Sequence, residues 1–255
     1  VIVTAKNRKR IQGITTIEPE MIRKIPGANA GVENILKTLP GVYSNNELST
    51  QYAVRGGNYD ENLVYVNEIE IYRPFLVRSG QQEGLSFVNT ALVQNLDFSA
   101  GGFQAKYGDK LSSVLDITYR TPDSTKASST VSLLGIEAHA EQSVSPRFNY
   151  IVGARYRSNG YFLNSLPTKG AYNPVFADAQ ILTNYSITDK VTFSLLGHFS
   201  SNAYRFSPQT AESDFGTANE AYRLMIYYDG KEATKFQTAM GGASLKFEPN
   251  KRTNL

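Results

Sequence analysis

The second half of the sequence alternates apolar and polar residues, and this pattern constrains the fold more than any other feature. One face of the strand expected at residues 148–157 carries Phe, Tyr, Val and Ala, while the other is polar except for Ile151. The same period of two returns at residues 129–144, 177–187, 191–200 and 239–247. Since successive side chains of a strand point to opposite faces, the sequence predicts about five antiparallel strands after residue 122.

Two architectures produce such strands: a soluble antiparallel sheet with one wet face, and a membrane barrel with a polar lumen. The connections at residues 145–147, 188–190 and 248–253 are short, whereas those at 158–175 and 202–235 are long. Alternating tight turns and large loops are typical of a membrane barrel. No stretch reaches the roughly 18 consecutive apolar residues of a spanning helix, but a closed barrel also satisfies its backbone in lipid. The pattern favours the barrel and leaves the soluble sheet as the alternative.

The first half, residues 1–122, has the mixed pattern of an α+β domain. A short helix is expected to open at Glu18-Pro19-Glu20, and Asn29 is a candidate N-cap for a second helix that ends at Pro40-Gly41. Short strands are expected at residues 51–55, 62–66, 93–100 and 113–119. The sequence therefore predicts a compact domain with a small mixed sheet and short helices, followed by the strands of residues 123–255.

Composition excludes several function classes. The chain has no cysteine, so it forms no disulfide or thiolate metal site. A formal charge of +3, evenly spread, predicts no nucleic-acid partner. With two His, no G-x-S-x-G elbow and no phosphate-cradling loop, the sequence predicts no enzyme, no catalytic residue and no cofactor.

Several motifs of the first half occur in a familiar order. Residues 33–42 (ENILKTLPGV) resemble the helix and exit turn of the plug domain of TonB-dependent receptors, and Arg55-Gly56 resembles its Arg-Gly motif. Residues 97–108 (DFSAGGFQAKYG) resemble its closing segment, and residues 112–117 (SSVLDI) continue it in a form associated with Bacteroidetes. Two departures are Asn67-Glu68, where the family often has Asp-Gly, and residues 99–102 (SAGG), where many members have Arg or Lys before Gly-Pro.

The resemblance implies a plug domain at residues 1–122 and the first strands of a 22-stranded plugged barrel at residues 123–255, hence a truncated portion of a larger protein in the outer membrane. It implies energised uptake of a ferric chelate, vitamin, glycan or peptide into the periplasm. The implied partners are TonB with its inner-membrane motor complex, outer-membrane lipid and the nutrient, and for a glycan or peptide also a surface lipoprotein lid. A signal-transducing receptor or a surface adhesin on the same scaffold is the alternative.

In such receptors the cargo meets outward-facing plug loops, which by position are residues 43–51, 57–61 and 71–80. The third loop mixes aromatic and cationic residues, which suit sugars, anions or aromatic chelates; otherwise Phe75 packs the loop and its Arg residues are solvated. The predicted substrate-binding residues are Asn45, Asn46, Tyr59, Tyr72, Arg73, Phe75 and Arg78. Arg55 and Gly56 are expected at a contact between plug and barrel, with a solvated Arg55 as the alternative.

Polar residues on the strands are expected to face a wet lumen. These lumen-facing residues are Glu137, His139, Arg155, Asp178 and Lys246. The Glu137-Ala138-His139-Ala140-Glu141 run has the ligand types of a metal site. We expect it instead to line the lumen and to pair with neighbours such as Arg155, so no metal site is predicted.

Overall fold

The chain forms two compact units, which are described separately. The computed structural model describes residues 13–18, 31–44, 50–72, 74, 85–158, 160, 170–208, 211–217, 220–227 and 230–249. The first unit comprises Val1–Pro74 and Val93–Arg120, and the second comprises Phe75–Leu92 and Thr121–Leu255. The last change of unit along the chain lies after Arg120, two residues before the predicted domain boundary at residue 122. Residues 75–92, however, group with the later strands, although the predicted plug includes them.

The first unit is built on a five-stranded mixed sheet. Its order is β1 (Ile14–Ile17), β6 (Val93–Ser99), β7 (Ser113–Tyr119), β4 (Asn62–Val66) and β5 (Ile69–Glu70). The β4–β7 pair is parallel and the other pairs are antiparallel. In the register, Ile117 on β7 lies between Leu96 on β6 and Val66 on β4, and all three are fully buried. This apolar row forms the centre of the unit.

Short elements surround this sheet. The helix expected from Asn29 is α2 (Val32–Leu36), and hydrogen-bonded turns follow it up to Gly41, which has a φ of 82°. The strand expected at residues 51–55 is only β3 (Ala53–Val54), which pairs with β2 (Val42–Tyr43), because the chain turns at Arg55. A 3-10 helix, η1 (Tyr59–Glu61), precedes β4. The helix expected at Pro19 lies outside the described residues. The N-cap of α2 is Gly31, which makes no side-chain cap, so the prediction of Asn29 as N-cap was wrong.

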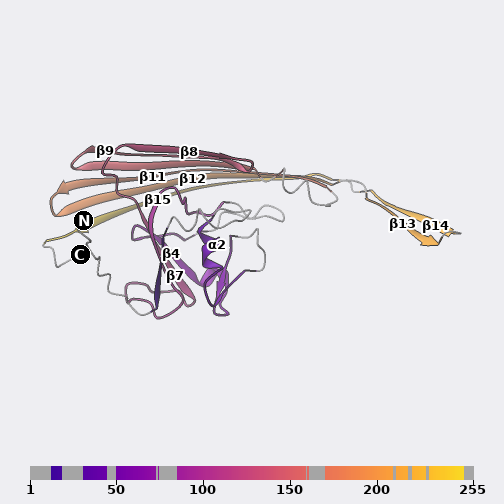
Figure 1. Cartoon of the computed structure of the whole chain (residues 1–255), viewed down its shortest axis with the longest axis horizontal. Coiled ribbons are helices and arrows are strands. Elements are labelled where there is room, and N and C mark those ends of the chain that lie inside the picture. Colours follow the sequence, from indigo (N-terminus) through magenta and orange to yellow (C-terminus); the bar gives the residue numbers. More distant parts are fainter. Residues whose placement is uncertain are drawn as a thin grey trace, which may run out of the picture. The chain divides into compact units, whose positions relative to one another are not determined.

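The second unit contains a six-stranded antiparallel sheet (Figure 1). Its order is β15 (Glu232–Phe247), β12 (Val191–Pro208), β11 (Gly170–Thr188), β10 (Phe148–Ser158), β9 (Gly135–Ser145) and β8 (Lys126–Ser132). Tight turns at Pro146-Arg147 and Asp189-Lys190 join β9 to β10 and β11 to β12. Within the described residues, no helix is long and apolar enough to cross a membrane.

The single strand predicted at residues 129–144 is a hairpin of two strands, so that prediction was wrong. β8 and β9 pair closely, with Ser132 opposite Gly135 and Leu133-Leu134 as the two-residue loop. The sequence hides this turn because it carries two Leu residues instead of the Asn, Asp or Gly that mark most two-residue hairpins. β8 (KASSTVS) is exposed along its whole length and has little apolar alternation.

Strands β11 and β12 are also longer than predicted. They contain 19 and 18 residues, whereas a membrane crossing needs about 9–11. The apolar alternation of β12 fades at Ser200-Ser201-Asn202. Its backbone pairing with β11 nevertheless continues to Pro208. The long connection after β12 contains a separate hairpin of β13 (Ala211–Thr217) and β14 (Glu220–Ile226).

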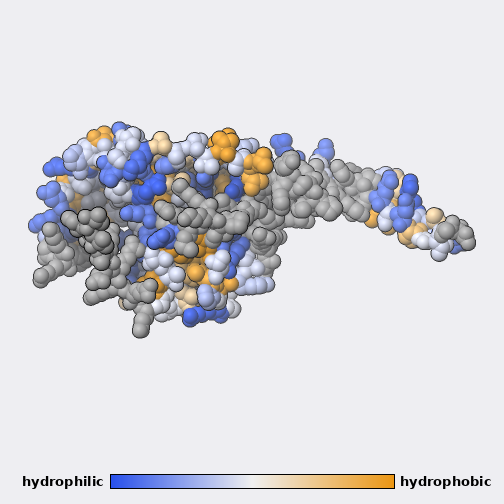
Figure 2. Space-filling model, in the orientation of Figure 1, coloured by the Kyte–Doolittle hydropathy of each residue, from blue (hydrophilic) through white to orange (hydrophobic). Residues whose placement is uncertain are grey.

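The two faces of the sheet differ as the alternation predicts. On β12, the even-numbered positions from Leu196 to Tyr204 are buried, and most of them are polar. The odd-numbered positions carry exposed apolar side chains, with Phe193 38% and Phe199 50% exposed. Figure 2 shows hydrophobic side chains at the surface of the sheet. Phe193 and Phe199 are six residues apart, roughly 20 Å along the strand, so a tilted strand keeps both within an apolar membrane band about 25 Å tall.

We predict that the apolar face contacts lipid. Leu195 lies between the two Phe residues on this face, and it is opposite Thr183 on β11 and Ala243 on β15. Leu195→Arg is expected to cost about 2–4 kcal/mol of folding free energy, because it places a cation within the hydrocarbon layer. The measurement is urea unfolding of the complete protein in lipid vesicles. The matched variant Ser194→Arg, on the opposite face, is expected to cost less than half as much; equal costs would contradict a lipid-facing surface.

Candidate functional site

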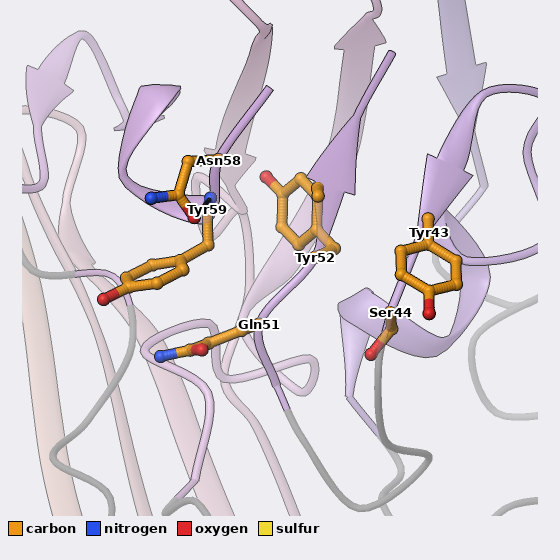
Figure 3. A pocket seen from close by; sticks show the side chains of 7 residues that line it. Tyr43, Ser44, Gln51, Tyr52, Asn58 and Tyr59 are labelled. Carbon is orange, nitrogen blue, oxygen red and sulfur yellow. Dashed lines mark hydrogen bonds between the residues drawn. The ribbon is translucent and has the colours of Figure 1, made fainter. Parts of the chain in front are cut away.

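Three short segments of the first unit enclose a small pocket (Figure 3). It has a volume of about 80 Å³ and is lined by Tyr43, Ser44, Gln51, Tyr52, Ala53, Asn58 and Tyr59. In Figure 3, Tyr43 and Tyr59 lie on opposite sides of Tyr52. Tyr43 is 64% exposed and Tyr59 is 43% exposed, whereas Tyr52 is buried. The lining is aromatic and neutral, so it can stack against a ring and hydrogen-bond to hydroxyl or amide groups.

Local structure fixes the pocket walls. The β2–β3 pair sets Tyr43 opposite Ala53, which brings both ends of the loop between them to one side. Asn58 is the N-cap of η1, and its side-chain oxygen accepts a hydrogen bond from the backbone N–H of Tyr59 at 2.9 Å. Asn is favoured at this position because it satisfies an otherwise unpaired donor at a helix start. The cap therefore orients both Asn58 and Tyr59.

Asn62 connects the pocket to the sheet. It is buried, and its side-chain N–H groups donate to the backbone oxygens of Tyr52 at 2.7 Å and Tyr59 at 3.2 Å. Its side-chain oxygen accepts from the Ser113 hydroxyl on β7 at 2.7 Å. Asn62 thus ties two pocket residues to the central strand of the sheet.

Tyr52 forms the buried floor of the pocket. Burial raises its pKa well above the usual range, the nearby Glu33 carboxylate raises it further, and the neighbouring Ser113 side chain partly offsets the rise. Glu33 lies on α2 and is itself buried. Tyr52 is therefore a neutral hydroxyl at physiological pH, and the floor of the pocket carries no charge from it.

Arg55 is where three of the sequence motifs meet. Arg55 and Gly56 have φ angles of 50° and 82°, and the Gly57 N–H donates to the Val54 oxygen across this turn at 3.0 Å. A side chain at Gly41 would lie 3.4 Å from the Arg55 side chain, and one at Gly101 would lie 3.1 Å from its guanidinium. Two glycines therefore leave room for Arg55, which itself adopts a backbone conformation uncommon for residues other than glycine.

The structure places the predicted substrate-binding residues as follows. Tyr59 lines the pocket, whereas Tyr72 is 82% exposed and is not part of it. Asn45, Asn46, Arg73, Phe75 and Arg78 lie outside the described residues. The role of all seven residues in binding stays a prediction, as does a contact of Arg55 and Gly56 with a barrel wall.

The predicted lumen residues lie on the sheet of the second unit. In the register, Arg155 is opposite both Glu137 and Asp178, and it pairs with Asp178 at 2.6 Å rather than with Glu137. His139 contacts the Ser128 hydroxyl at 2.6 Å, and Lys246 pairs with Glu248 at 3.1 Å. Asp178 is buried and the other four predicted residues are partly exposed. Their facing a lumen stays a prediction.

Within the described part of the chain, no three His, Asp or Glu side chains converge in a way that could hold a metal ion. In the β9 run considered for metal binding, Glu141 is instead 3.7 Å from Lys126 on β8.

Comparison with protein families gives a match at residues 6–114, to the family described as TonB-dependent Receptor Plug Domain. This range contains the pocket, Asn62, Arg55 and both departures from the family pattern. Residues 6–114 are therefore similar to the plug domain of TonB-dependent receptors. Comparison with the curated proteins finds none that matches.

Solved structures of plugged barrels share the fold. The siderophore receptor PirA from Acinetobacter baumannii is 14% identical, with a TM-score of 0.57, and the match covers 97% of this chain and 47% of PirA. The outer membrane transporter YddB from Escherichia coli is 12% identical over 92% of this chain and 45% of YddB, with a TM-score of 0.55. FpvA from P. aeruginosa, solved with bound pyoverdine and iron, is 11% identical over 95% of this chain and 32% of FpvA, with a TM-score of 0.59.

The chain spans less than half the length of these receptors. The comparisons confirm the predicted fold class, a plug domain followed by antiparallel barrel strands. This combination places the chain in the outer membrane, as the sequence predicts.

Sequence reasoning placed five of the seven lining residues in loops expected to meet the cargo, but it predicted only Tyr59 as a binding residue. Tyr43 and Gln51 were recognised only as ends of a loop, and Tyr52 was assigned to a strand. A buried Tyr directly before a short strand carries no signal by itself. Asn62 was likewise treated as an ordinary strand residue, because its three hydrogen bonds involve residues up to 51 positions away.

We predict that Asn62→Ala loosens the pocket. The variant removes three hydrogen bonds and leaves buried partners unsatisfied, at a cost of about 2–3 kcal/mol. The expected result is faster hydrogen exchange in residues 50–62 of the complete receptor, with little change in the barrel strands. Asn95→Ala is the control, since Asn95 bonds to Asp97 on its own strand. Unchanged exchange in Asn62→Ala would show that the backbone path alone fixes the pocket.

Proposed function

We propose that this chain is the plug and first barrel strands of a receptor that takes up a nutrient across the outer membrane, driven by TonB and its inner-membrane motor complex. The observation that carries the proposal is the pocket of the plug domain, which joins two of the loops where such receptors are expected to meet their cargo. Its volume of about 80 Å³ holds one ring or a few polar groups, whereas sites for whole ligands are about 300–1,000 Å³. The cargo is therefore larger than the pocket and contacts further loops.

The chemistry of the lining narrows the part of the cargo that enters. Among the described residues, no charged side chain lines the pocket, so recognition by this lining rests on stacking against Tyr43 and Tyr59 and on neutral hydrogen bonds from Ser44, Gln51 and Asn58. A hydroxylated ring fits this lining, whether it belongs to a ferric chelate or to a sugar. Siderophore receptors are among the structural neighbours, so ferric chelates are the first cargo to test.

The other parts of the proposal rest on the family resemblance. We infer that the receptor transports its cargo and catalyses no reaction, and that TonB pulls on the chain N-terminal to the plug. The residues inferred to complete the cargo site are Asn45, Asn46, Tyr72, Arg73, Phe75 and Arg78. A Bacteroidetes-type receptor with a lipoprotein lid is the form expected if the cargo is a glycan or peptide.

The test is growth of the host, with and without the intact gene, on ferric chelates, cobalamin, glycans and peptides, each as the limiting nutrient. A defect on one nutrient that also follows inactivation of the inner-membrane motor is the expected result. A receptor whose loss affects growth on none of them would instead be assigned to signalling or adhesion.

We predict that the two exposed Tyr residues of the pocket tune uptake of that nutrient. Tyr59→Ala and Tyr43→Ala are each expected to raise the concentration for half-maximal uptake about two- to tenfold, because an aromatic contact contributes about 0.5–1.5 kcal/mol. The matched variants Tyr59→Phe and Tyr43→Phe keep the ring and isolate the hydroxyl contribution. If both Ala variants take up the nutrient like the unaltered receptor, the pocket is not part of the cargo site.

A further inference from the structure

Residues 85–92, here called the anchor segment, belong to the unit of the barrel strands although plug strands flank them in sequence. The second unit contains Phe75–Leu92, while β4 before it and β6 after it belong to the first unit. Seven of the eight residues of the anchor segment are buried, with only Thr90 partly exposed. Residues of β10, β11 and β12, in the same unit, contact this segment.

Arg155 on β10 binds the backbone of the anchor segment. One terminal nitrogen of its guanidinium donates to the Val88 oxygen at 2.9 Å, and the other donates to the Ser86 oxygen at 2.7 Å. The same guanidinium also donates to both carboxylate oxygens of Asp178 on β11, at 2.8 and 2.6 Å. Asp178 thus fixes the planar fork in the orientation that reaches the two carbonyls.

Gln180 on β11 binds the carbonyl between those two. Its side-chain nitrogen donates to the Phe87 oxygen and also to Asp178, the latter at 3.1 Å. Two side chains of the sheet therefore hold three consecutive backbone oxygens, at residues 86, 87 and 88. A buried carbonyl without a donor is costly, so loss of these side chains would destabilise the buried position of the anchor segment. The three hydrogen bonds therefore stabilise the segment against the sheet.

Side-chain packing adds contacts to three neighbouring strands. The Phe87 ring lies 4.7 Å from the His198 ring on β12, and Leu85 packs with Phe176 on β11. Gly153 on β10 permits the closest approach, because a side chain there would lie 2.6 Å from the Asn89 amide and 3.0 Å from Leu92. Glycine at this strand position is explained by the segment that crosses it.

We propose that the anchor segment is a fixed attachment of the plug to the barrel wall, held by Arg155, Asp178 and Gln180, and that force on the N-terminus releases the chain only up to this segment. β1, α2 and β4 precede it and can be pulled away in sequence order. β6 and β7 follow it and are shielded from the pull. Only its role during uptake rests on the proposed function; the attachment itself does not depend on any cargo.

The test is single-molecule pulling of the complete receptor in a lipid bilayer, with the handle on the N-terminus. Unaltered receptor is expected to stop extending near residue 84. The double variant Arg155→Met with Asp178→Asn removes the fork without leaving an unpaired buried charge. It is expected to extend by roughly 120 Å more before the barrel resists, since residues 85–120 then follow at about 3.5 Å each.

A matched control uses another cross-strand Arg–Asp pair. Arg223 on β14 binds Asp214 on β13 at 2.7 Å, and this exposed pair has no contact with the anchor segment. Arg223→Met with Asp214→Asn is expected to leave the pulling length unchanged. The proposal is overturned if the unaltered receptor already extends past residue 92, or if the Arg155 double variant stops where the unaltered receptor does.

A cross-link tests whether the anchor segment stays attached while Arg155, Asp178 and Gln180 are unaltered. It serves if the double variant does not fold. Asn89→Cys with Gly153→Cys pairs two positions in close contact. The smaller side chain at position 89 relieves the closest overlap at residue 153, and the Leu92 side chain must shift by a few tenths of an ångström. This chain has no other cysteine. Oxidised and reduced forms are expected to give the same pulling length; a shorter oxidised form would show that the segment normally leaves the wall.

Discussion

Backbone pairing between neighbouring antiparallel strands is the constraint on which the rest of this structure depends. A strand that faces lipid has no water to satisfy its N–H and C=O groups, so each must bond to the strand beside it. The pairing of β9 to β12 and β15 with their neighbours meets this requirement, and the period of two assigns successive side chains to opposite faces. One face is apolar and exposed. The other carries buried polar groups such as Asp178, Gln180 and His198.

The polar face of the sheet binds the backbone of residues 86–88. Arg155 and Gln180 would be expensive to bury without partners, and the three backbone oxygens of residues 86–88 would be equally expensive without donors. Each set satisfies the other. The result is a sheet whose polar face binds one short piece of the chain through its main chain, while the remaining plug sequence forms a separate compact unit around β7.

In the plug domain, a few polar residues organise the loops that enclose the pocket. Asn62 holds the carbonyls of Tyr52 and Tyr59, and Asn58 caps the helical turn that carries Tyr59. Arg55 occupies space left by Gly41 and Gly101, so residues of three motifs that are separated in sequence lie together in the fold. The loops can therefore carry exposed aromatic side chains because the residues beneath them are fixed by hydrogen bonds.

The sequence alone determined the class of fold, the strands β4 and β7 to the residue, and the two faces of the later strands. The strands and their faces follow from local periodicity, whereas the plug and barrel class was implied by the resemblance of short motifs to a known family. Residues 129–144 were misread because a Leu-Leu turn has no distinguishing chemistry, and β11 and β12 were predicted too short because their pairing outlasts their apolar alternation. Tertiary structure alone decided that Asp178 rather than Glu137 binds Arg155, that Tyr52 closes a pocket, and that residues 85–92 join the strands. Each of these depends on which of several chemically suitable partners comes within about 3 Å, and only the folded chain fixes that distance.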